Sequence, residues 1–357
     1  MLTALPYFPK LTYARFKKLW QYFSNPENIW QAEIGELIQA GWDANIAAEF
    51  MEWREGVNVE KIKTELEKEK ITTVVLGQPG YPRLLSEIAD PPFVLFVRGT
   101  LPPDEQPAVA IVGTRKCSTY GKQVTEQLAT ELARAKVVVV SGLALGIDGV
   151  AHQAVLAAGG TTIAVLGSGV NQTNIYPASH QHLAEQIIKN DGAIISEYPP
   201  GFEPTQYSFP ARNRIIAGLT LGTLVTEAPT NSGALITAKC ALDYNREVFA
   251  VPHPLTSVNG AGGNNLLKMG ARLVTSATDI LDEFQIHNIE QIITNNKILP
   301  STPNEAKLLP HLSKEPTHID ALTKASGLDS GTVGSTLTMM EMKGKVKNVG
   351  GMQYIVK

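Results

Sequence analysis

The sequence predicts an α/β protein: a Rossmann-like, doubly wound and mostly parallel sheet, with a small all-α domain before it and a winged-helix domain after it. Three patterns predict this architecture. The middle of the chain alternates apolar runs, glycine-containing loops and helical segments, the start shows only helical spacing, and the tail combines three short helices with two short strands. We place the three domains at residues 1–72, 73–284 and 304–357, with a polar linker at 285–303.

Composition excludes several classes of protein. The 357 residues are 43% hydrophobic and 18% charged, which is typical of a soluble globular chain. No aliphatic run approaches the ~20 residues of a membrane helix, and the N-terminus lacks the features of a signal peptide. Cys117 and Cys240 cannot form a disulfide framework, so we expect reduced thiols in a cytoplasmic protein without metal or cofactor. A net charge of −3 argues against coating nucleic acid indiscriminately but is compatible with a local basic groove.

Six apolar runs in the middle of the chain predict the strands of the sheet. Several are apolar at every position, as strands buried on both faces must be. In such sheets ligands bind at the carboxyl ends of the strands, so the loops after the strands are the candidate functional segments. The predicted strands are 108–112, 137–140, 161–166, 193–195, 223–226 and 248–251.

The two ends of the chain carry less chemical information. The first domain has turns at Asn25-Pro26 and Gly41-Trp42 and a charged helix over 59–70. In the tail we expect helices at 304–312, 319–326 and 332–343 and strands at 346–349 and 353–356. The predicted recognition helix offers no arginine to read a base edge, and Lys343, Lys345 and Lys347 lie toward the wing. This pattern favours a protein-contact or weak DNA role over specific reading of a duplex.

The loop after the first predicted strand contains Gly113, Thr114 and Arg115. Small residues let backbone amides approach an anion, and Arg115 can hold a phosphate with two parallel hydrogen bonds. The alternative is a tight turn with a surface arginine. The stretch GTRKCS lacks the G-x-G-x-x-G fingerprint, so it does not predict a dinucleotide site. We include Ser118, from the same loop, among the candidate binding residues.

The strongest cluster is the stretch FPARNRIIAG, which begins at Phe209. Pro210 favours an extended Phe209, so we expect a helix to start close to Arg212. Arg212, Asn213 and Arg214 would then lie at the positive end of the helix dipole, and Phe209 offers a face on which a base can stack. Cations beside an aromatic ring fit single-stranded nucleic acid better than a small metabolite. The alternative is a buried Phe209 with arginines paired to carboxylates such as those of Glu197 and Glu227.

Two further loops offer weaker signals. Ser232 and Gly233 begin a helix whose amide and hydroxyl donors can hold an anion, whereas Lys239 on that helix can point the other way. Asp148 and His152 share one helical face and can form an acid/base pair, but an aspartate in the first turn is more often a cap. His180 and His182, which lack ligand partners at metal-site spacing, are interpreted as surface residues.

Taken together and in order, these loops resemble the DNA processing protein A family of bacteria, also called DprA or Smf. The resemblance spans roughly residues 81–283 and rests on VAIVGTRKCSTYG, SGLALGIDGVAH, FPARNRIIAGL, LVTEAPTNSGALITA and REVFAVP. The chain departs from the family at two places. Many relatives have Val-Pro-Gly where it has Val251-Pro252-His253-Pro254, and they commonly have Asn after the Tyr-Pro loop where it has Ser179-His180. The first departure affects a loop that can border a dimer or partner surface.

The resemblance implies a non-enzymatic protein that binds and protects incoming single-stranded DNA. It also implies loading of the RecA recombinase during natural transformation and a homodimer formed through the Rossmann-like domain. The N-terminal region resembles the sterile-alpha-motif-like domain of many members, and the tail resembles their winged helix. Carried over by position, the family's DNA pocket comprises Gly113, Thr114, Arg115, Phe209, Arg212, Asn213, Arg214, Ser232, Gly233 and Lys239.

An enzymatic alternative stays open. The predicted core also resembles enzymes that cleave nucleotide N-glycosidic bonds, which carry a Gly-Gly-x-Gly-Thr loop and a catalytic glutamate. The corresponding stretch here is Thr230-Asn231-Ser232-Gly233-Ala234, and the missing motif argues against such a hydrolase; Glu227 is the glutamate that would test it. An NAD-dependent oxidoreductase is not favoured, because the loops lack the G-x-G-x-x-G fingerprint of dinucleotide-binding sites.

Overall fold

The computed structural model describes residues 2–23, 26–286, 300, 302–313 and 315–356. The chain divides into two compact units, Met1–His287 and Asn288–Lys357. The first unit contains both the N-terminal helices and the sheet, so a domain boundary at residue 72 stays a prediction. Most of the predicted linker, and Asn25 of the first predicted turn, lie outside the described residues. In the described part of the chain, no helix has the length and apolar character to cross a membrane.

The described part of the first unit contains one nine-stranded sheet with the order β1-β2-β6-β5-β4-β3-β7-β8-β9. Neighbours from β6 to β9 in this order are parallel, whereas β2 is antiparallel to both β1 and β6. The strands are β1 (Ile71–Val75), β2 (Val94–Gly99), β3 (Ala108–Gly113), β4 (Val138–Ser141), β5 (Thr162–Val165), β6 (Ala193–Ser196), β7 (Gly222–Glu227), β8 (Glu247–Ala250) and β9 (Arg272–Leu273).

The predicted doubly wound, mostly parallel sheet is confirmed. All six predicted strands are present, each within about two residues of its predicted ends. Strands β1, β2 and β9 were not predicted. Strand β2 follows Pro91-Pro92, a pair that favours a loop, and β9 is a pair of exposed residues with no apolar pattern.

The order of the strands places a crevice between β3 and β7. From β3 the chain moves outward through β4, β5 and β6, and then returns to add β7 on the other side of β3. The connections after β3 and β7 therefore leave toward opposite faces, which opens a gap at the carboxyl ends of these two strands. This is the position at which doubly wound sheets bind ligands.

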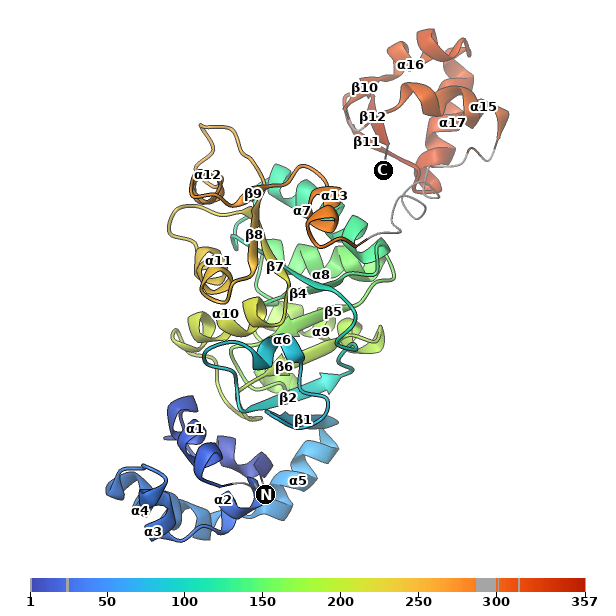
Figure 1. Cartoon of the computed structure of the whole chain (residues 1–357). Coiled ribbons are helices and arrows are strands. Elements are labelled where there is room, and N and C mark those ends of the chain that lie inside the picture. The colour runs from blue at the N-terminus through green and yellow to red at the C-terminus, as the bar shows by residue number, and fades with distance from the viewer. Residues whose placement is uncertain (1, 24–25, 287–299, 301, 314, 357) are drawn as a thin grey trace. The chain divides into compact units, whose positions relative to one another are not determined.

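Helices cover both faces of this sheet (Figure 1). The helices α10, α11 and α12 pack on one face, where their apolar side chains join those of β3, β4 and β5 in a shared core. The helices α7, α8, α9 and α13 cover the other face. These helices are α7 (Thr119–Arg134), α8 (Ile147–Ala157), α9 (Gln181–Lys189), α10 (Ser208–Gly218), α11 (Ala234–Asp243), α12 (Ala261–Lys268) and α13 (Ala277–Glu283).

The predicted N-terminal helices are present and have their own aromatic core. The ring of Phe16 from this region stacks on Phe93, which precedes β2, with 4.4 Å between ring centroids. Helix α5 packs on β1 and buries Leu66, so the predicted charged helix is solvated on one side only. The elements are η1 (Leu2–Tyr7), α1 (Tyr13–Tyr22), α2 (Pro26–Gln31), α3 (Ile34–Gln39), α4 (Ala44–Gly56) and α5 (Val59–Lys68).

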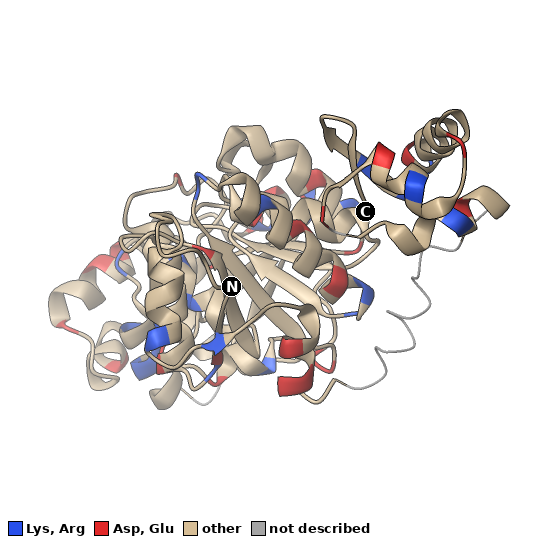
Figure 2. Cartoon of the chain, turned by 90° about the horizontal axis from the view of Figure 1, so that it is seen from above, with Lys and Arg blue, Asp and Glu red and all other residues tan. Residues whose placement is uncertain are grey.

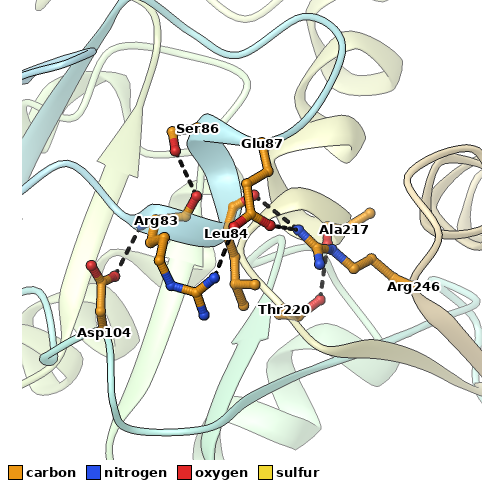
Figure 3. A network of polar contacts seen from close by, with 8 residues as sticks. All are labelled: Arg83, Leu84, Ser86, Glu87, Asp104, Ala217, Thr220 and Arg246. Atoms are coloured by element: carbon orange, nitrogen blue, oxygen red, sulfur yellow. Dashed lines mark hydrogen bonds and ion pairs between the residues drawn. The ribbon is translucent and has the colours of Figure 1, made fainter.

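A polar network attaches the short helix α6 (Arg83–Ser86) to the connection between α11 and β8 (Figure 3). The Arg246 guanidinium, which follows α11, donates to the Leu84 carbonyl at 3.1 Å and to the Glu87 carboxylate at 3.1 Å. Glu87 also accepts from Arg83 at 2.8 Å. The hydrogen bond from Arg246 is the main cause that lowers the pKa of Glu87. This network fixes the connection between β1 and β2 against α11 and β8.

The second unit is a winged helix, as predicted, with an additional short strand at β10. A buried carboxylate, that of Glu305 (1% exposed), accepts from Lys343 at 2.8 Å and from Lys345 at 2.5 Å. Two of the three wing lysines are therefore directed toward the domain's own interior. The elements are α15 (Pro303–Leu308), η4 (Leu309–His311), β10 (Thr317–His318), α16 (Ile319–Ser326), α17 (Ser330–Met342), β11 (Val346–Gly350) and β12 (Gln353–Val356).

We predict that Phe16→Ala lowers the free energy of unfolding of the N-terminal helices by about 3–5 kcal/mol, because it removes a fully buried ring and leaves a cavity. All four tryptophans lie within residues 20–53, so tryptophan fluorescence during urea unfolding reports on this region alone. Ile38→Ala, at an exposed position of α3, is the matched control and should change the midpoint little. A Phe16→Ala midpoint equal to that of the control would contradict the packing described.

Candidate functional site

A cavity of about 810 Å³ lies in the crevice at the carboxyl ends of β3 and β7. Its lining contains three cationic side chains and one carboxyl group, that of Asp148. It brings together eight of the candidate residues from three segments, the end of β3 with its following loop, the helix α10 and the turn before α11: Gly113, Thr114, Arg115, Phe209, Arg212, Asn213, Ser232 and Gly233.

The loop after β3 is tied to its neighbours by its own backbone. The Thr114 amide donates to the Glu227 carbonyl at 2.7 Å, and the Thr114 carbonyl accepts from the Ile147 amide at 3.2 Å. Gly146 has a φ of +77°, and a Cβ there would lie 2.3 Å from the Thr114 carbonyl oxygen, so only glycine allows this approach. Since the Thr114 amide is engaged, the exposed side chains of Arg115 and Lys116 supply the positive charge at this edge of the cavity.

Helix α10 starts earlier than the sequence suggested. The expectation that Phe209 is extended and that the helix begins near Arg212 is wrong, because α10 begins at Ser208. Reciprocal hydrogen bonds between the side chains and amides of Thr205 and Ser208 fix this start. Pro210 then lies in the first turn, where its missing N–H has no partner to lose. Phe209, Arg212 and Asn213 consequently share one face of the helix.

The guanidinium of Arg212 is buried rather than displayed to solvent. Arg212 is 5% exposed, and it donates to the carbonyls of Gly142, at 2.7 Å, and Val165. Burial lowers the pKa of Arg212 to about 10, and the nearby Asp148 opposes this shift. A Cβ on Gly142 would lie 2.5 Å from the guanidinium, so a side chain there would displace it. Arg212 lines the floor of the cavity and stabilises the ends of β4 and β5.

Aromatic rings form one wall of the cavity. The Arg115 guanidinium lies over the Phe209 ring, 5.6 Å from its centroid, which is a cation–π distance. The Tyr176 ring lies 5.5 Å from Phe209 between centroids, with the two planes inclined by 47°. A cation and two rings therefore meet at one place on the rim.

The start of α11 forms the opposite wall. Ser232 Oγ accepts from the Ala234 amide at 3.3 Å, and the Asn213 side chain donates to the Gly233 carbonyl at 3.2 Å. Asn213 Oδ1 accepts from Arg212 at 3.2 Å. Asn213 thus connects α10 to α11 across the cavity.

Three candidate residues do not line this cavity. Arg214 points to the other side of α10, where it pairs with Glu197 at 2.6 Å and with Asp90 at 3.2 Å; the alternative of arginines paired to carboxylates describes it correctly. Ser118 caps α7 and lines a separate hollow near His253. Lys239 is exposed on α11, away from the cavity lining, as the direction of successive helical residues allows.

The carboxylate of Glu227 is committed to the protein itself. Glu227 is buried, and its two oxygens accept from the Ser118 amide at 2.7 Å and the Ser118 hydroxyl at 2.6 Å. Glu227 does not line the cavity. The residue that a glycosidic hydrolase would need as its catalytic glutamate therefore holds the start of α7 in place.

Asp148 and His152 do not form an acid/base pair. Asp148 accepts from the Gly142 and Ala144 amides at 3.1 and 3.4 Å, so it caps the loop, while burial raises its pKa. His152 is fully buried, and Thr162 Oγ1 lies 2.7 Å from its Nδ1. That hydroxyl donates to the Val139 carbonyl, so it accepts from Nδ1–H.

The expectation for the other two histidines holds only in part. His182 is exposed, as predicted. His180 is half-buried, and its Nδ1 lies 2.8 Å from the Leu143 carbonyl, so it is not the surface residue that its spacing suggested. Its role is to hold the loop after β4.

The exposed lining residues that sequence reasoning missed include Lys116 and Tyr176. Lys116 directly follows Arg115 in the loop that was singled out, so its charge was available as a signal. Tyr176 belongs to a Tyr-Pro pair that carried no assigned role. Basic and acidic residues are intermixed over the structure (Figure 2), so overall charge does not reveal the cavity.

The fold and site define a class: a doubly wound α/β protein with a basic, aromatic-rimmed cavity at the switch point of its sheet, and a winged helix appended. The family model for DNA recombination-mediator protein A matches residues 72–285, and that for the DprA winged helix domain matches residues 295–352. The chain belongs to this family of DNA-processing recombination mediators.

Individual proteins of this family are similar to the chain in sequence and in structure. Protein Smf from Synechocystis sp. is 35% identical over 95% of this chain and 94% of its own length. The X-ray structure of DNA processing protein A from Streptococcus pneumoniae has a TM-score of 0.68 at 37% identity, covering 79% of this chain and 98% of that one. The corresponding protein from Helicobacter pylori, solved to describe its single-stranded DNA binding mode, has a TM-score of 0.53 at 31% identity, covering 60% of this chain and 96% of that one.

We predict that His152 makes stability depend on pH. Burial lowers the pKa of His152 to about 3, so between that value and about 6.5 the unfolded chain binds a proton that the folded chain excludes. Stability attributable to His152 is therefore lost as the pH falls below about 6.5, amounting to about 2 kcal/mol at pH 5.

Urea unfolding at pH 7.5 and pH 5, followed by circular dichroism, measures this dependence. His152→Asn, whose side-chain amide can donate to Thr162 in the same way, should lose about 2 kcal/mol less than the wild type between the two pH values. His182→Asn, at an exposed position, should retain the wild-type dependence. Equal pH dependence in wild type and His152→Asn would contradict the neutral, buried imidazole.

Proposed function

We propose that this chain binds single-stranded DNA in the cavity between β3 and β7. The observation that carries the proposal is the meeting of Arg115 and Lys116 with the Phe209 ring at one rim of that cavity. Cations suit the phosphates of a single strand, and the half-buried Phe209 ring at the cavity rim suits unpaired bases, whose faces are free only when the duplex is open. The Helicobacter pylori relative, described for its single-stranded DNA binding mode, supports the same assignment.

The proposed roles differ among the candidate residues. Arg115, with Lys116 beside it, contacts phosphates, and Phe209 stacks on a base. Gly113, Thr114, Asn213, Ser232 and Gly233 shape the walls along which the strand lies. Arg212 acts mainly by stabilising the floor of the cavity, through its hydrogen bonds to the Gly142 and Val165 carbonyls. Ser118, Arg214 and Lys239 act outside the cavity: Ser118 and Arg214 support the loops, and Lys239 belongs to the surface of α11.

We further propose that the bound strand is protected and passed to the RecA recombinase, in natural transformation and recombination, by a cytoplasmic homodimer without catalytic activity. The family assignment supports the DNA-processing part of this role. Recombinase loading requires a second surface, which the departure at Pro252-His253-Pro254 can modify. Sedimentation velocity at micromolar concentration tests the dimer, and a single monomeric species would contradict it.

For the winged helix we propose contact with protein rather than reading of a duplex. Lys343 and Lys345 are engaged by Glu305, and α17 exposes the apolar side chains of Met339 and Met342. Methionine-rich surfaces adapt to protein partners, whereas duplex reading needs side chains that hydrogen-bond to base edges.

A nucleotide N-glycosidic hydrolase is not favoured, because the Glu227 carboxylate is held by Ser118 and does not face the cavity. Release of free base from a nucleoside monophosphate, abolished by Glu227→Gln, would be the result that restores this alternative.

We predict that Arg115→Ala weakens binding to every single-stranded sequence alike and reduces the slope of log affinity against log salt by about 0.7, because one phosphate contact is lost. Fluorescence anisotropy of a labelled oligo-dT across a salt series measures both quantities, with a duplex of equal length as competitor. Phe209→Ala should cost about 1–3 kcal/mol of binding energy and leave the slope unchanged.

Arg134→Ala is the matched control. It removes an exposed arginine at the end of α7, which lies at the amino ends of the strands, away from the cavity. Its affinity and salt slope should equal those of the wild type. Equal slopes for Arg115→Ala and wild type would contradict the phosphate contact, and stronger binding of the duplex would contradict the choice of single-stranded DNA.

We predict that the chain shortens the lag before RecA filaments grow on single-stranded DNA that is covered by a single-strand-binding protein. The reason is that a mediator must hold the strand before the recombinase can nucleate on it. The rate of RecA-catalysed ATP hydrolysis reports filament growth, and Arg115→Ala should restore most of the lag. An unchanged lag at saturating wild-type protein would contradict recombinase loading while leaving DNA binding in place.

A further inference from the structure

Tyr176 is an aromatic side chain that the proposed roles above do not use. It is 50% exposed, and it lines the same cavity as Arg115 and Phe209. The preceding residue, Ile175, is buried in the core beneath the sheet's second face. The chain thus anchors one residue and displays the next one, with a large ring, at the rim of a basic cavity.

The loop that carries Tyr176 is held rigidly. Ser168 Oγ donates to the Asn174 carbonyl at 2.7 Å, and the buried Asn174 side chain donates to Glu203 at 2.9 Å and to the Phe202 carbonyl at 3.3 Å. A side chain displayed by an ordered loop loses little conformational freedom when a ligand binds to it. Tyr176 is therefore positioned in advance for contact.

The geometry of the two rings decides how many bases they can hold. The planes of Tyr176 and Phe209 are inclined by 47°, with centroids 5.5 Å apart, so the rings do not stack on each other. A flat base that lies parallel to one ring is inclined by about the same angle to the other, and it cannot stack on both. Two rings with this inclination offer two separate faces, side by side.

We propose that Tyr176 is a second stacking platform, which takes a base next to the one on Phe209 along the same single strand. This inference rests on the proposed function, since it requires single-stranded DNA in the cavity. The Tyr176 ring supplies contact area without charge, so it strengthens binding without adding a phosphate contact. It also lengthens the bound segment beyond one nucleotide.

The test uses the full chain and a labelled oligo-dT in anisotropy. Tyr176→Ala should weaken binding about five- to hundredfold, with the log–log salt slope unchanged, because a neutral ring releases no counterions. Tyr176→Phe and Tyr176→Trp should bind as the wild type does, because they keep a face for stacking. Tyr22→Ala, which removes a 43% exposed ring that does not line the cavity, is the matched control and should bind normally.

A double variant separates stacking from mere support of Phe209. If Tyr176 holds its own base, Tyr176→Ala should still weaken binding severalfold in a Phe209→Ala background. A double variant that binds as tightly as Phe209→Ala alone would overturn the proposal, because Tyr176 would then act only by positioning Phe209.

Crosslinking of the wild-type protein avoids any loss of folding in the variants. An oligo-dT carrying 5-iododeoxyuridine, irradiated in the complex, should crosslink to peptides containing both Tyr176 and Phe209. Crosslinks at Phe209 without any at Tyr176 would overturn the inference alone. Absence of binding by the wild type, or an unaltered salt slope for Arg115→Ala, would instead contradict the proposed function.

Discussion

The buried guanidinium of Arg212 is the interaction on which the site depends. It donates to the Gly142 and Val165 carbonyls at the ends of two neighbouring strands, and so fixes α10 relative to the sheet. A carbonyl deprived of its buried donor costs roughly 1–3 kcal/mol, and this one side chain donates to two carbonyls. Because Arg212 is fixed, Phe209 one turn earlier is held at the rim and Asn213 can reach the start of α11. The cation that the sequence offered as a phosphate ligand thus builds the floor of the cavity.

The loops around the cavity use one set of polar groups to hold their own structure and another set to present charge to solvent. The Thr114 amide donates to the Glu227 carbonyl of the neighbouring strand, and Ser232 Oγ accepts from the Ala234 amide within its own turn, so these polar groups hold the loops in place. The charge that faces solvent comes from Arg115 and Lys116, whose side chains are long enough to follow a flexible strand. A hydrogen-bonded frame with exposed cations at its rim suits a polyanion of variable sequence better than one small ligand of fixed shape.

The sequence predicted the sheet well because buried parallel strands consist of continuous apolar residues, as in 108–112. It also predicted where the cavity lies, because such sheets form a crevice where their strands end. Side-chain direction was harder to predict: Arg212 and Arg214 are two residues apart on one helix, and only tertiary contacts show that one faces the cavity and the other faces Glu197. Strand β2 and the start of α10 were missed because prolines near them signalled a loop and an extended residue, whereas burial and the Thr205–Ser208 hydrogen bonds prevailed. Tyr176 carried no pattern that spacing alone could distinguish from a turn.

The most direct test of the central claim, that a single strand lies between the carboxyl ends of β3 and β7, is amide hydrogen exchange of the full chain with and without a saturating oligo-dT. Exchange maps the bound strand onto the backbone without any substitution. We predict that added DNA slows exchange at 113–117, 205–213 and 229–233. Slowing confined to residues 330–356 of the winged helix, with the cavity loops unchanged, would contradict the account.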